Sequence, residues 1–314
     1  MISRRGVVSG IMLAGLLAGG MPMSVRAQHP VEGIEWMVQN LRPYGQPVIP
    51  SFDGWIAKPD GTYNLCFGYF NLNLEEVLEI PLGADNFIEP ASFDGMQPTH
   101  FLPVPPPPDL YRRFFCVFTV NVPAGFEDRV VWTLVQDGRE YKVPGHLHET
   151  SYQLSEAYQF NQGSDSWPPL VKFVDPPGPE GAGRDGIMVG PVTVPVGSPL
   201  TLAISVGFPE YATEDMLDPT MARDRDGRRR DDDDGPRRVW WVKWAKHQGP
   251  GDVTFQGGET NVFAREETVT SSATFSEPGR YLLRVQAIDN PTESGSFQFH
   301  CCWTNGYVEV IVTQ

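Results

Sequence analysis

Prolines and glycines limit how long any regular element of this chain can be. The 314 residues include 30 prolines and 32 glycines, which interrupt every apolar run before it reaches helical length. Apolar residues instead occupy alternate positions, as in Leu200, Leu202, Ile204 and Val206, and Val308 begins the same period near the C-terminus. Alternation places the apolar residues of a strand on a single face. The sequence therefore predicts an all-β fold with two β-sandwich domains.

The N-terminal residues 1–27 have the pattern of an export signal. Arg4 and Arg5 precede an apolar run over residues 7–17, and a small-residue cleavage signal ends at Ala27. We expect cleavage after Ala27 and a mature chain in the periplasm, at the cell surface or outside the cell. The apolar run is too short and too rich in glycine to cross the roughly 30 Å hydrocarbon core, so no stable membrane insertion is predicted. The paired arginines leave twin-arginine export of a folded protein open beside ordinary secretion of an unfolded chain.

The mature chain is strongly acidic. The full sequence has 24 Lys and Arg residues and 39 Asp and Glu residues, and the signal contains three arginines and no acid, so the mature net charge is 21 minus 39, or −18. Such a surface repels nucleic acids and anionic lipid headgroups, which makes both poor partner candidates. High net charge also keeps an exported protein in solution.

Four cysteines in an exported chain predict disulfides before metal ligands or catalytic thiols. Cys66 and Cys116 lie in two strand-like runs of one domain, TYNLCFGYF and RRFFCVFTVNV, and we expect them to form a disulfide. Cys301 and Cys302 are adjacent, so they would pair with each other only under strain, and a partner outside the chain is the alternative. The sequence has no separated C-x-x-C pairs of the kind that predict a zinc site.

Turn residues divide the N-terminal half into hairpins. Residues 58–61, Lys-Pro-Asp-Gly, separate two strand-like runs, and residues 136–138, Gln-Asp-Gly, separate two more. Residues 74–83 favour an extended edge segment over a helix because Pro81 interrupts them. We assign residues 28–160 to an N-terminal β-sandwich-like domain. Its motifs FDGW, FGYFNLN and EIPLGADNFIEP resemble those of uncharacterised exported bacterial proteins, and this resemblance implies no activity.

A composition change marks the start of the second half. Residues 161–186 are rich in proline, glycine and polar residues, and we interpret them as a linker to a second β unit over residues 187–314. Within that unit, WAKHQGPGDVTF and TVTSSATFSEPGRYLLRVQAID follow each other between Trp244 and Asp289. This segment resembles the PKD-type branch of immunoglobulin-like β-sandwiches, whose members carry W-x-x-x-x-G-P-G-x-V-x-F and then T-F-x-x-P-G-x-Y-x-L-R-x-x-A-x-D.

The resemblance implies scaffold roles for its most recognisable residues. Trp244 is expected between the two sheets, and Tyr281 is expected to bond back to the backbone at the corner formed by residues 277–279. The matching positions are Trp244, Gly249, Pro250, Gly251, Val253, Phe255, Phe275, Pro278, Gly279, Tyr281, Leu283, Arg284, Ala287 and Asp289.

A charged insertion, residues 209–238, precedes the tryptophan strand. Its segment RDRDGRRRDDDDGPRR contains seven arginines and six aspartates. In the resembled family this loop is often rich in Asp and can hold calcium, which takes about six to eight oxygen ligands. Because the arginines neutralise the carboxylates and the EF-hand spacing is missing, we favour a self-paired, solvated loop over a calcium site. The calcium alternative assigns the ligands to Asp224, Asp226, Asp231 and Asp233.

Histidines and aromatic residues supply two further candidate sites. His146 and His148 have the spacing that places both rings on one side of a strand, where Glu149 would complete a metal site, although we favour a loop. Aromatic residues beyond those that one sandwich face needs predict a surface for sugar rings or protein partners, with burial in the core as the alternative. These aromatic candidates are Trp55, Tyr63, Phe67, Tyr69, Trp240 and Trp241.

The sequence favours binding over catalysis. It contains no G-x-S-x-G nucleophile elbow, H-E-x-x-H zinc helix or phosphate-binding glycine loop. Our leading hypothesis is an exported, non-enzymatic binding or adhesion-type protein of the periplasm or cell surface, with a glycan or a surface protein as its partner. One alternative is a secreted hydrolase with a catalytic N-terminal domain, which a cleft of carboxylates converging on a histidine would favour. Another is a structural subunit of a surface assembly that donates or accepts strands.

Overall fold

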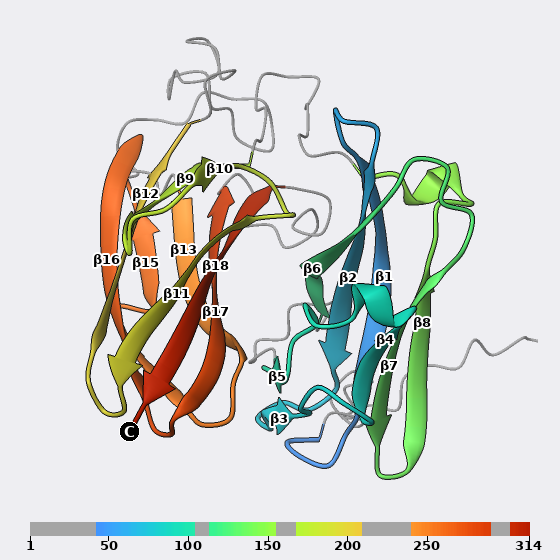
Figure 1. The fold of residues 1–314 in the computed structure, drawn as a ribbon, viewed down its shortest axis with the longest axis horizontal. Coiled ribbons are helices and arrows are strands. Elements are labelled where there is room, and N and C mark those ends of the chain that lie inside the picture. The colour runs from blue at the N-terminus through green and yellow to red at the C-terminus, as the bar shows by residue number, and fades with distance from the viewer. Residues whose placement is uncertain (1–41, 104–112, 155–167, 209–239, 290–301) are drawn as a thin grey trace, which may run out of the picture. The chain divides into compact units, whose positions relative to one another are not determined.

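In the residues described by the structure, a computed structural model shown in Figure 1, the regular elements are strands and two short 3-10 helices. The predicted all-β fold is confirmed. Within the described part of the chain, no helix is long and apolar enough to cross a membrane. The export signal and the charged insertion lie outside the described residues. The structure describes residues 42–103, 113–154, 168–208, 240–289 and 302–314.

Six strands of the N-terminal half form two three-stranded sheets, with the orders β1-β2-β6 and β4-β7-β8. Both predicted hairpins are present, because β1 pairs antiparallel with β2 and β7 with β8. At the second turn, Asp137 and Gly138 adopt the positive φ angles, 50° and 73°, that a two-residue hairpin loop requires. The strands are β1 (Val48–Ala57), β2 (Tyr63–Asn71), β4 (Asn86–Glu89), β6 (Arg113–Val122), β7 (Val130–Gln136) and β8 (Arg139–Gly145).

The two N-terminal sheets share one aromatic core. Phe67 of β2 stacks on Phe118 of β6 with ring centroids 5.4 Å apart, and Trp132 of β7 packs edge-on against Phe118 at 5.1 Å. All three side chains are fully buried. Gln136 also links the sheets, because its side-chain amide donates to the Val48 carbonyl at 2.7 Å and accepts the Val48 N–H at 2.9 Å. The Gln136 side chain therefore makes the two hydrogen bonds with Val48 that a backbone residue of a paired strand would make.

The N-terminal motifs hold irregular backbone in place. Asp53 of FDGW accepts the N–H of Cys116, a residue with a φ of 41°, at 2.5 Å and also pairs with Arg113. Asn71 of FGYFNLN donates to the carbonyls of Glu76 and Phe101 at 2.9 and 3.1 Å. Both side chains are buried, so these recognisable residues serve the scaffold.

Residues 74–83 contain no helix, as predicted, but only Leu78 and Glu79 form a strand, and residues 74, 75 and 82 are bends. They belong to a long connection whose backbone is fixed by the buried side chain of Asn86. Its amide nitrogen donates to the carbonyls of Ile80 and Pro98 at 2.9 and 2.8 Å, and its amide oxygen accepts from Trp132 Nε1 at 3.0 Å. The short elements here and beyond β8 are β3 (Leu78–Glu79), η1 (Ala91–Phe93), β5 (His100–Phe101) and η2 (Thr150–Tyr152).

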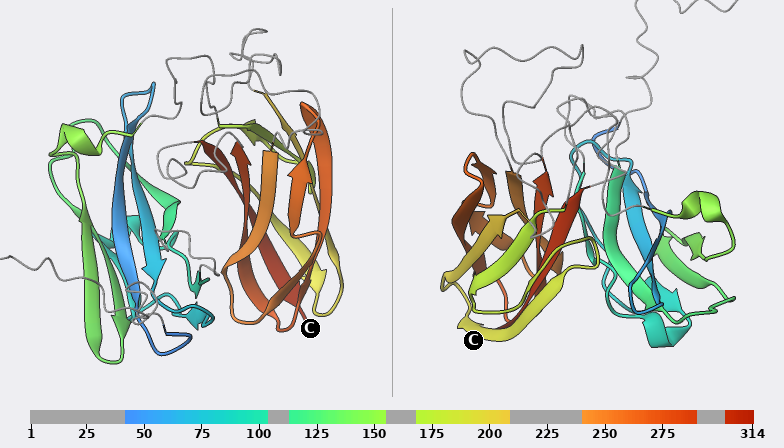
Figure 2. Two further views of the ribbon diagram at one scale, coloured as in Figure 1. Left: turned by 180° about the vertical axis from the view of Figure 1, so that it is seen from behind. Right: turned by 90° about the horizontal axis from the view of Figure 1, so that it is seen from above.

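Ten strands of the C-terminal half form two five-stranded sheets, which Figure 1 and Figure 2 show from three sides. The groove sheet, named for the site described below, has the order β10-β9-β12-β16-β14. The seam sheet, named for its contacts with β6, has the order β11-β18-β17-β13-β15. The strands are β9 (Leu170–Asp175), β10 (Glu180–Gly181), β11 (Ile187–Pro195), β12 (Leu200–Gly207), β13 (Trp240–Gln248), β14 (Val253–Gln256), β15 (Glu259–Val262), β16 (Glu266–Phe275), β17 (Gly279–Asp289) and β18 (Trp303–Thr313).

The two C-terminal sheets enclose one apolar core. The alternating residues of β12 and β18 face it, which confirms the predicted period. Trp244 lies in the same core with 6 % of its surface exposed, as expected. The corner between β16 and β17 is also as expected, because the Tyr281 hydroxyl donates to the Glu277 carbonyl at 2.8 Å and accepts the Gly251 N–H at 3.0 Å.

The linker prediction for residues 161–186 is wrong where the structure describes them. β9 and β10 lie inside this range, and β9 pairs antiparallel with β12 as an inner strand of the groove sheet. Val171 and Phe173 of β9 are buried in the C-terminal core. Prolines flank this strand without entering it, so composition averaged over the range conceals a six-residue alternating run.

The predicted Cys66–Cys116 disulfide is present and joins β2 to β6. The two cysteines are 50 residues apart in the sequence. Closing a loop of that length stabilises a fold by about 4 kcal/mol in the chain-entropy account. Cys302 is buried and disulfide-bonded as well.

Side chains of the seam sheet bind the backbone of β6, an edge strand of its own sheet. The carbonyl of Val117 accepts from Arg284 at 3.1 Å and from Tyr307 at 2.9 Å, and the carbonyl of Cys116 accepts from Asn305 at 3.3 Å. Burial raises the pKa of Tyr307 to about 12, so its hydroxyl remains protonated and donates. Residues 41–314 accordingly form one compact unit, and the division into two domains stays a prediction.

Candidate functional site

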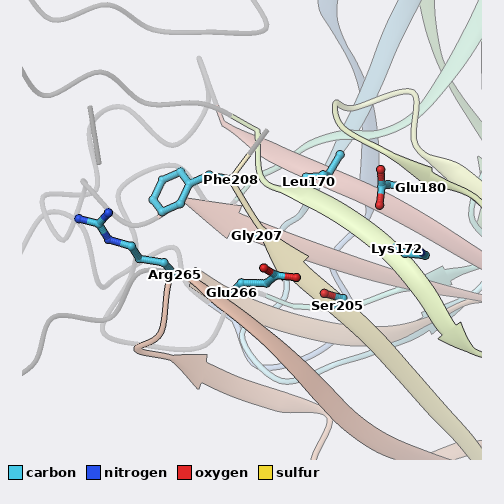
Figure 3. Close-up of a pocket in the computed structure, with 8 residues that line it drawn as sticks. All are labelled: Leu170, Lys172, Glu180, Ser205, Gly207, Phe208, Arg265 and Glu266. Carbon is cyan, nitrogen blue, oxygen red and sulfur yellow. The ribbon is translucent and has the colours of Figure 1, made fainter. Parts of the chain in front are cut away.

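A groove of about 350 Å³ lies on the outer face of the groove sheet, where β9, β10, β12 and the start of β16 meet (Figure 3). Its walls combine charged, hydroxyl and apolar side chains. The residues that line it are Leu170, Lys172, Glu180, Ser205, Gly207, Phe208, Arg265 and Glu266.

Strand alternation explains why these residues face outward. Ile204 and Val206 of β12 are in the core, so Ser205 and Gly207 lie on the opposite face. Strand register then sets their neighbours: Gly207 lies opposite Leu170 on β9 and opposite Glu266 on β16. One row of the groove thus runs across three strands.

A second row runs beside the first, two residues further along each strand. Ser205 lies opposite Lys172 of β9, and Lys172 lies opposite Glu180 of β10. Neighbouring strands are about 4.8 Å apart and same-face residues about 6.8 Å apart along a strand. The two rows therefore place carboxylate, ammonium and hydroxyl groups within reach of one small molecule.

Gly207 forms the open floor of the groove. A Cβ atom built at this position would meet Glu266 Cγ at 3.5 Å, which is ordinary van der Waals contact. The backbone conformation there is accessible to any residue, because its φ lies outside the left-handed region. The space above Gly207 can thus be filled by substitution without backbone strain.

Phe208 closes one end of the groove. Its ring packs against Trp240 with centroids 4.6 Å apart, which anchors it to the C-terminal core. Figure 3 shows this ring beside the groove, with the Arg265 side chain extending away from Ser205 at the same end. Leu170 supplies a second apolar wall.

The four charged residues of the groove are exposed. Lys172 and Arg265 are cationic, and Glu180 and Glu266 are anionic. None of the four forms an ion pair with another residue in the described ranges. Lys243 of the seam sheet, in contrast, pairs with Glu259 at 2.9 Å.

The structure does not gather the six aromatic candidates on a binding surface. Trp55, Phe67, Tyr69 and Trp240 are buried, so for these four the core alternative holds and the prediction of a surface role is wrong. Tyr63 is half-buried and packs edge-on against Trp55 at 5.5 Å. Trp241 is half-buried beside Lys243, whose ammonium lies 4.2 Å from the ring centroid.

The predicted histidine pair is present without a metal-binding arrangement. The rings of His146 and His148 stack 5.0 Å apart, and the backbone N–H of His148 lies 3.3 Å from His146 Nδ1. His148 Nε2 faces the Glu127 carbonyl at 2.8 Å. No group of three or more metal-ligating side chains occurs among the described residues. The calcium candidates Asp224, Asp226, Asp231 and Asp233 lie outside those residues.

A carboxylate and a histidine do meet, away from the groove. Glu79 Oε1 lies 2.5 Å from His100 Nδ1 and 2.7 Å from Lys246 Nζ. Burial alone would raise the pKa of Glu79, but the two hydrogen bonds and the positive charges outweigh it and hold that pKa below its ordinary value. A carboxylate of this kind stays ionised and acts as a hydrogen-bond acceptor, not as a general acid.

Sequence reasoning missed the groove because its residues are unremarkable one by one. The available signal was in LTLAISVGF, where small residues, Ala203, Ser205 and Gly207, alternate with large apolar ones. Small outward side chains on an inner strand leave a depression between its neighbours.

The chain matches no protein-family model and no curated protein at a significant level of sequence similarity.

Proposed function

We propose that this chain is an exported, non-enzymatic binding protein of the periplasm or cell surface, and that the groove on its PKD-like, immunoglobulin-type C-terminal half holds the ligand. The observation that carries the proposal is the set of four charged side chains without described ion-pair partners around an open floor. Charged groups left in this way on one face fit a ligand better than they fit a scaffold. The disulfide agrees with an oxidising compartment.

Strand addition fits the edges of the C-terminal sheets less well than ligand binding does. The groove sheet ends in β10, with two residues, and β14, with four. The seam sheet has β11 at one edge, where the ladder is interrupted between Val189 and Val192 and Pro191 and Pro195 lack an N–H. Short or proline-interrupted edges oppose pairing with another chain, so we favour the binding role over that of a strand-exchanging subunit.

Capture experiments with groove variants test the proposal. The mature chain, residues 28–314, is immobilised and exposed to a glycan array and to surface extracts of the source cells. Gly207→Val fills the floor, and Thr201→Val on the same outward face of β12 is the matched control. We expect ligand capture by the wild type and by Thr201→Val and its loss in Gly207→Val, with unchanged far-UV circular dichroism in all three. Equal capture by the two variants would refute a role for the groove.

A secreted hydrolase is the competing function, and the contact between Glu79 and His100 is the observation that favours it. Hydrolysis of a glycan or peptide substrate that is abolished by His100→Gln but unaffected by Gly207→Val would replace the binding proposal.

A further inference from the structure

We propose that the groove takes a neutral saccharide of one or two rings. This inference rests on the proposed function, because it names the class of ligand for the same site. It is carried by three properties of the lining: its charge balance, its apolar walls and its size.

The charge balance favours a ligand without net charge. Two cations and two carboxylates line the groove, so their formal charges cancel. The chain as a whole has a net charge of −15, which repels anions at longer range. A cation drawn by that field meets Lys172 and Arg265 at the groove itself. Neither an anionic nor a cationic ligand is therefore favoured both by the groove residues and by the net charge of the chain.

Hydroxyl groups match the hydrogen-bonding capacity of this lining. Glu180 and Glu266 only accept hydrogen bonds when ionised, whereas Lys172 and Arg265 only donate. A sugar hydroxyl both donates and accepts, so adjacent hydroxyls satisfy a carboxylate and a cation at the same time. Ser205 lies opposite Lys172, Glu266 lies opposite Gly207 in the neighbouring row, and the Ser205 hydroxyl also both donates and accepts.

The apolar walls match the other surface of a sugar ring. Phe208 and Leu170 border a floor that otherwise consists of polar groups and the Gly207 backbone. Saccharides present C–H faces as well as hydroxyls, and aromatic rings bind such faces. A zwitterionic peptide would instead bring two more charges to be desolvated among four existing ones, which is costly unless the pairing geometry is close to ideal.

The size of the groove sets the limit on the ligand. Its volume of about 350 Å³ is near the low end of small-molecule sites, which run from about 300 to 1,000 Å³. A stable protein partner would need roughly 20 to 30 residues on each side of the interface, and the groove is lined by eight. A monosaccharide or disaccharide is the ligand that this volume accommodates.

Isothermal titration calorimetry on the mature chain tests the inference with defined probes. The neutral probes are maltose, cellobiose, lactose and N,N′-diacetylchitobiose; the charged probes are galacturonate, glucosamine and the dipeptide Ala-Lys. We expect at least one neutral probe to bind, about tenfold or more weaker binding in Glu266→Gln, loss of binding in Gly207→Val, and wild-type affinity in Thr201→Val. Thermal unfolding of each variant identifies any that fails to fold, and Lys172→Met then substitutes for it as an independent groove variant.

The outcomes separate this inference from the proposed function. Groove-dependent binding of a charged probe alone overturns the neutral-saccharide assignment and leaves the groove as a binding site. A neutral saccharide that binds Gly207→Val as tightly as the wild type also overturns it. If no probe binds while the capture experiment yields a groove-dependent protein partner, the saccharide inference fails and the binding function stands. If neither experiment shows dependence on the groove, both fail.

Discussion

Acidification should destabilise this protein through His247. The imidazole is 2 % exposed, and its Nε2 lies 2.8 Å from the carbonyl of Met96, to which it donates in the neutral form. Burial, followed by the nearby charge of Arg284, lowers the pKa of His247 to about 3. In the unfolded chain the same side chain titrates at about 6.5.

The sign of the effect follows from proton binding in the two states. Between about pH 6.5 and pH 3 the unfolded chain holds a proton on this histidine and the folded chain does not, so the stability falls as the pH falls. For pKa values of about 3 and 6.5, the loss in the free energy of unfolding between about pH 7.5 and pH 5 is about 2 kcal/mol. Few carboxylates with ordinary pKa values titrate in this interval.

Urea unfolding at these two pH values, on the wild type and on His247→Gln, isolates the contribution. Glutamine keeps an N–H donor for the Met96 carbonyl and has no titrating group. We expect the variant to lose about 2 kcal/mol less than the wild type over the interval. His146, whose pKa is also lowered by burial and by His148, contributes equally to both proteins and cancels in the difference. Parallel losses in the two proteins would refute the buried, neutral state of His247.

Two further predictions concern side chains that hold backbone. Tyr281→Phe removes the acceptor of the Gly251 N–H and the donor to the Glu277 carbonyl. We expect the free energy of unfolding, measured with urea, to fall by about 1–3 kcal/mol. Tyr44→Phe, at a residue that is exposed in the wild type, is the near-neutral control. Asn86→Ala leaves three buried hydrogen-bond partners unsatisfied and should lower the free energy of unfolding by about 3 kcal/mol or more. Asn121→Ala, on the exposed face of β6, should lower it by less than about 1 kcal/mol. Equal effects of the two substitutions would contradict the role of Asn86 in holding the connection.

Local patterns were sufficient to predict much of the fold. The turn residues at 58–61 and 136–138 predict the two hairpins, and alternation in β12 and β18 predicts which face of each strand is buried. The disulfide followed from the strand-like surroundings of Cys66 and Cys116. In each case the information lies within a few neighbouring residues, which is the range over which turn chemistry and side-chain period act.

The sequence did not predict which side chains are buried by segments from elsewhere in the chain. Trp55 and Trp240 were predicted as surface aromatics, yet both are buried. Asn71 and Asn86 look like loop residues and are buried hydrogen-bond clamps. β9 was hidden in a range whose average composition is that of a linker. Burial at these positions is decided by segments far away in the sequence, which no local pattern reports.

The outer faces of the two C-terminal sheets illustrate the same limit and bear on where a ligand binds. Arg284, Asn305 and Tyr307 point outward from the seam sheet and read as solvent-facing polar residues, but they are buried against the carbonyls of β6. That face is therefore used within the chain, and its polar groups are satisfied there. The outer face of the groove sheet carries Lys172 and Glu266 without such partners in the described ranges. Among the described residues, β6 thus occupies the outer face of the seam sheet, and the groove lies on the outer face of the other sheet.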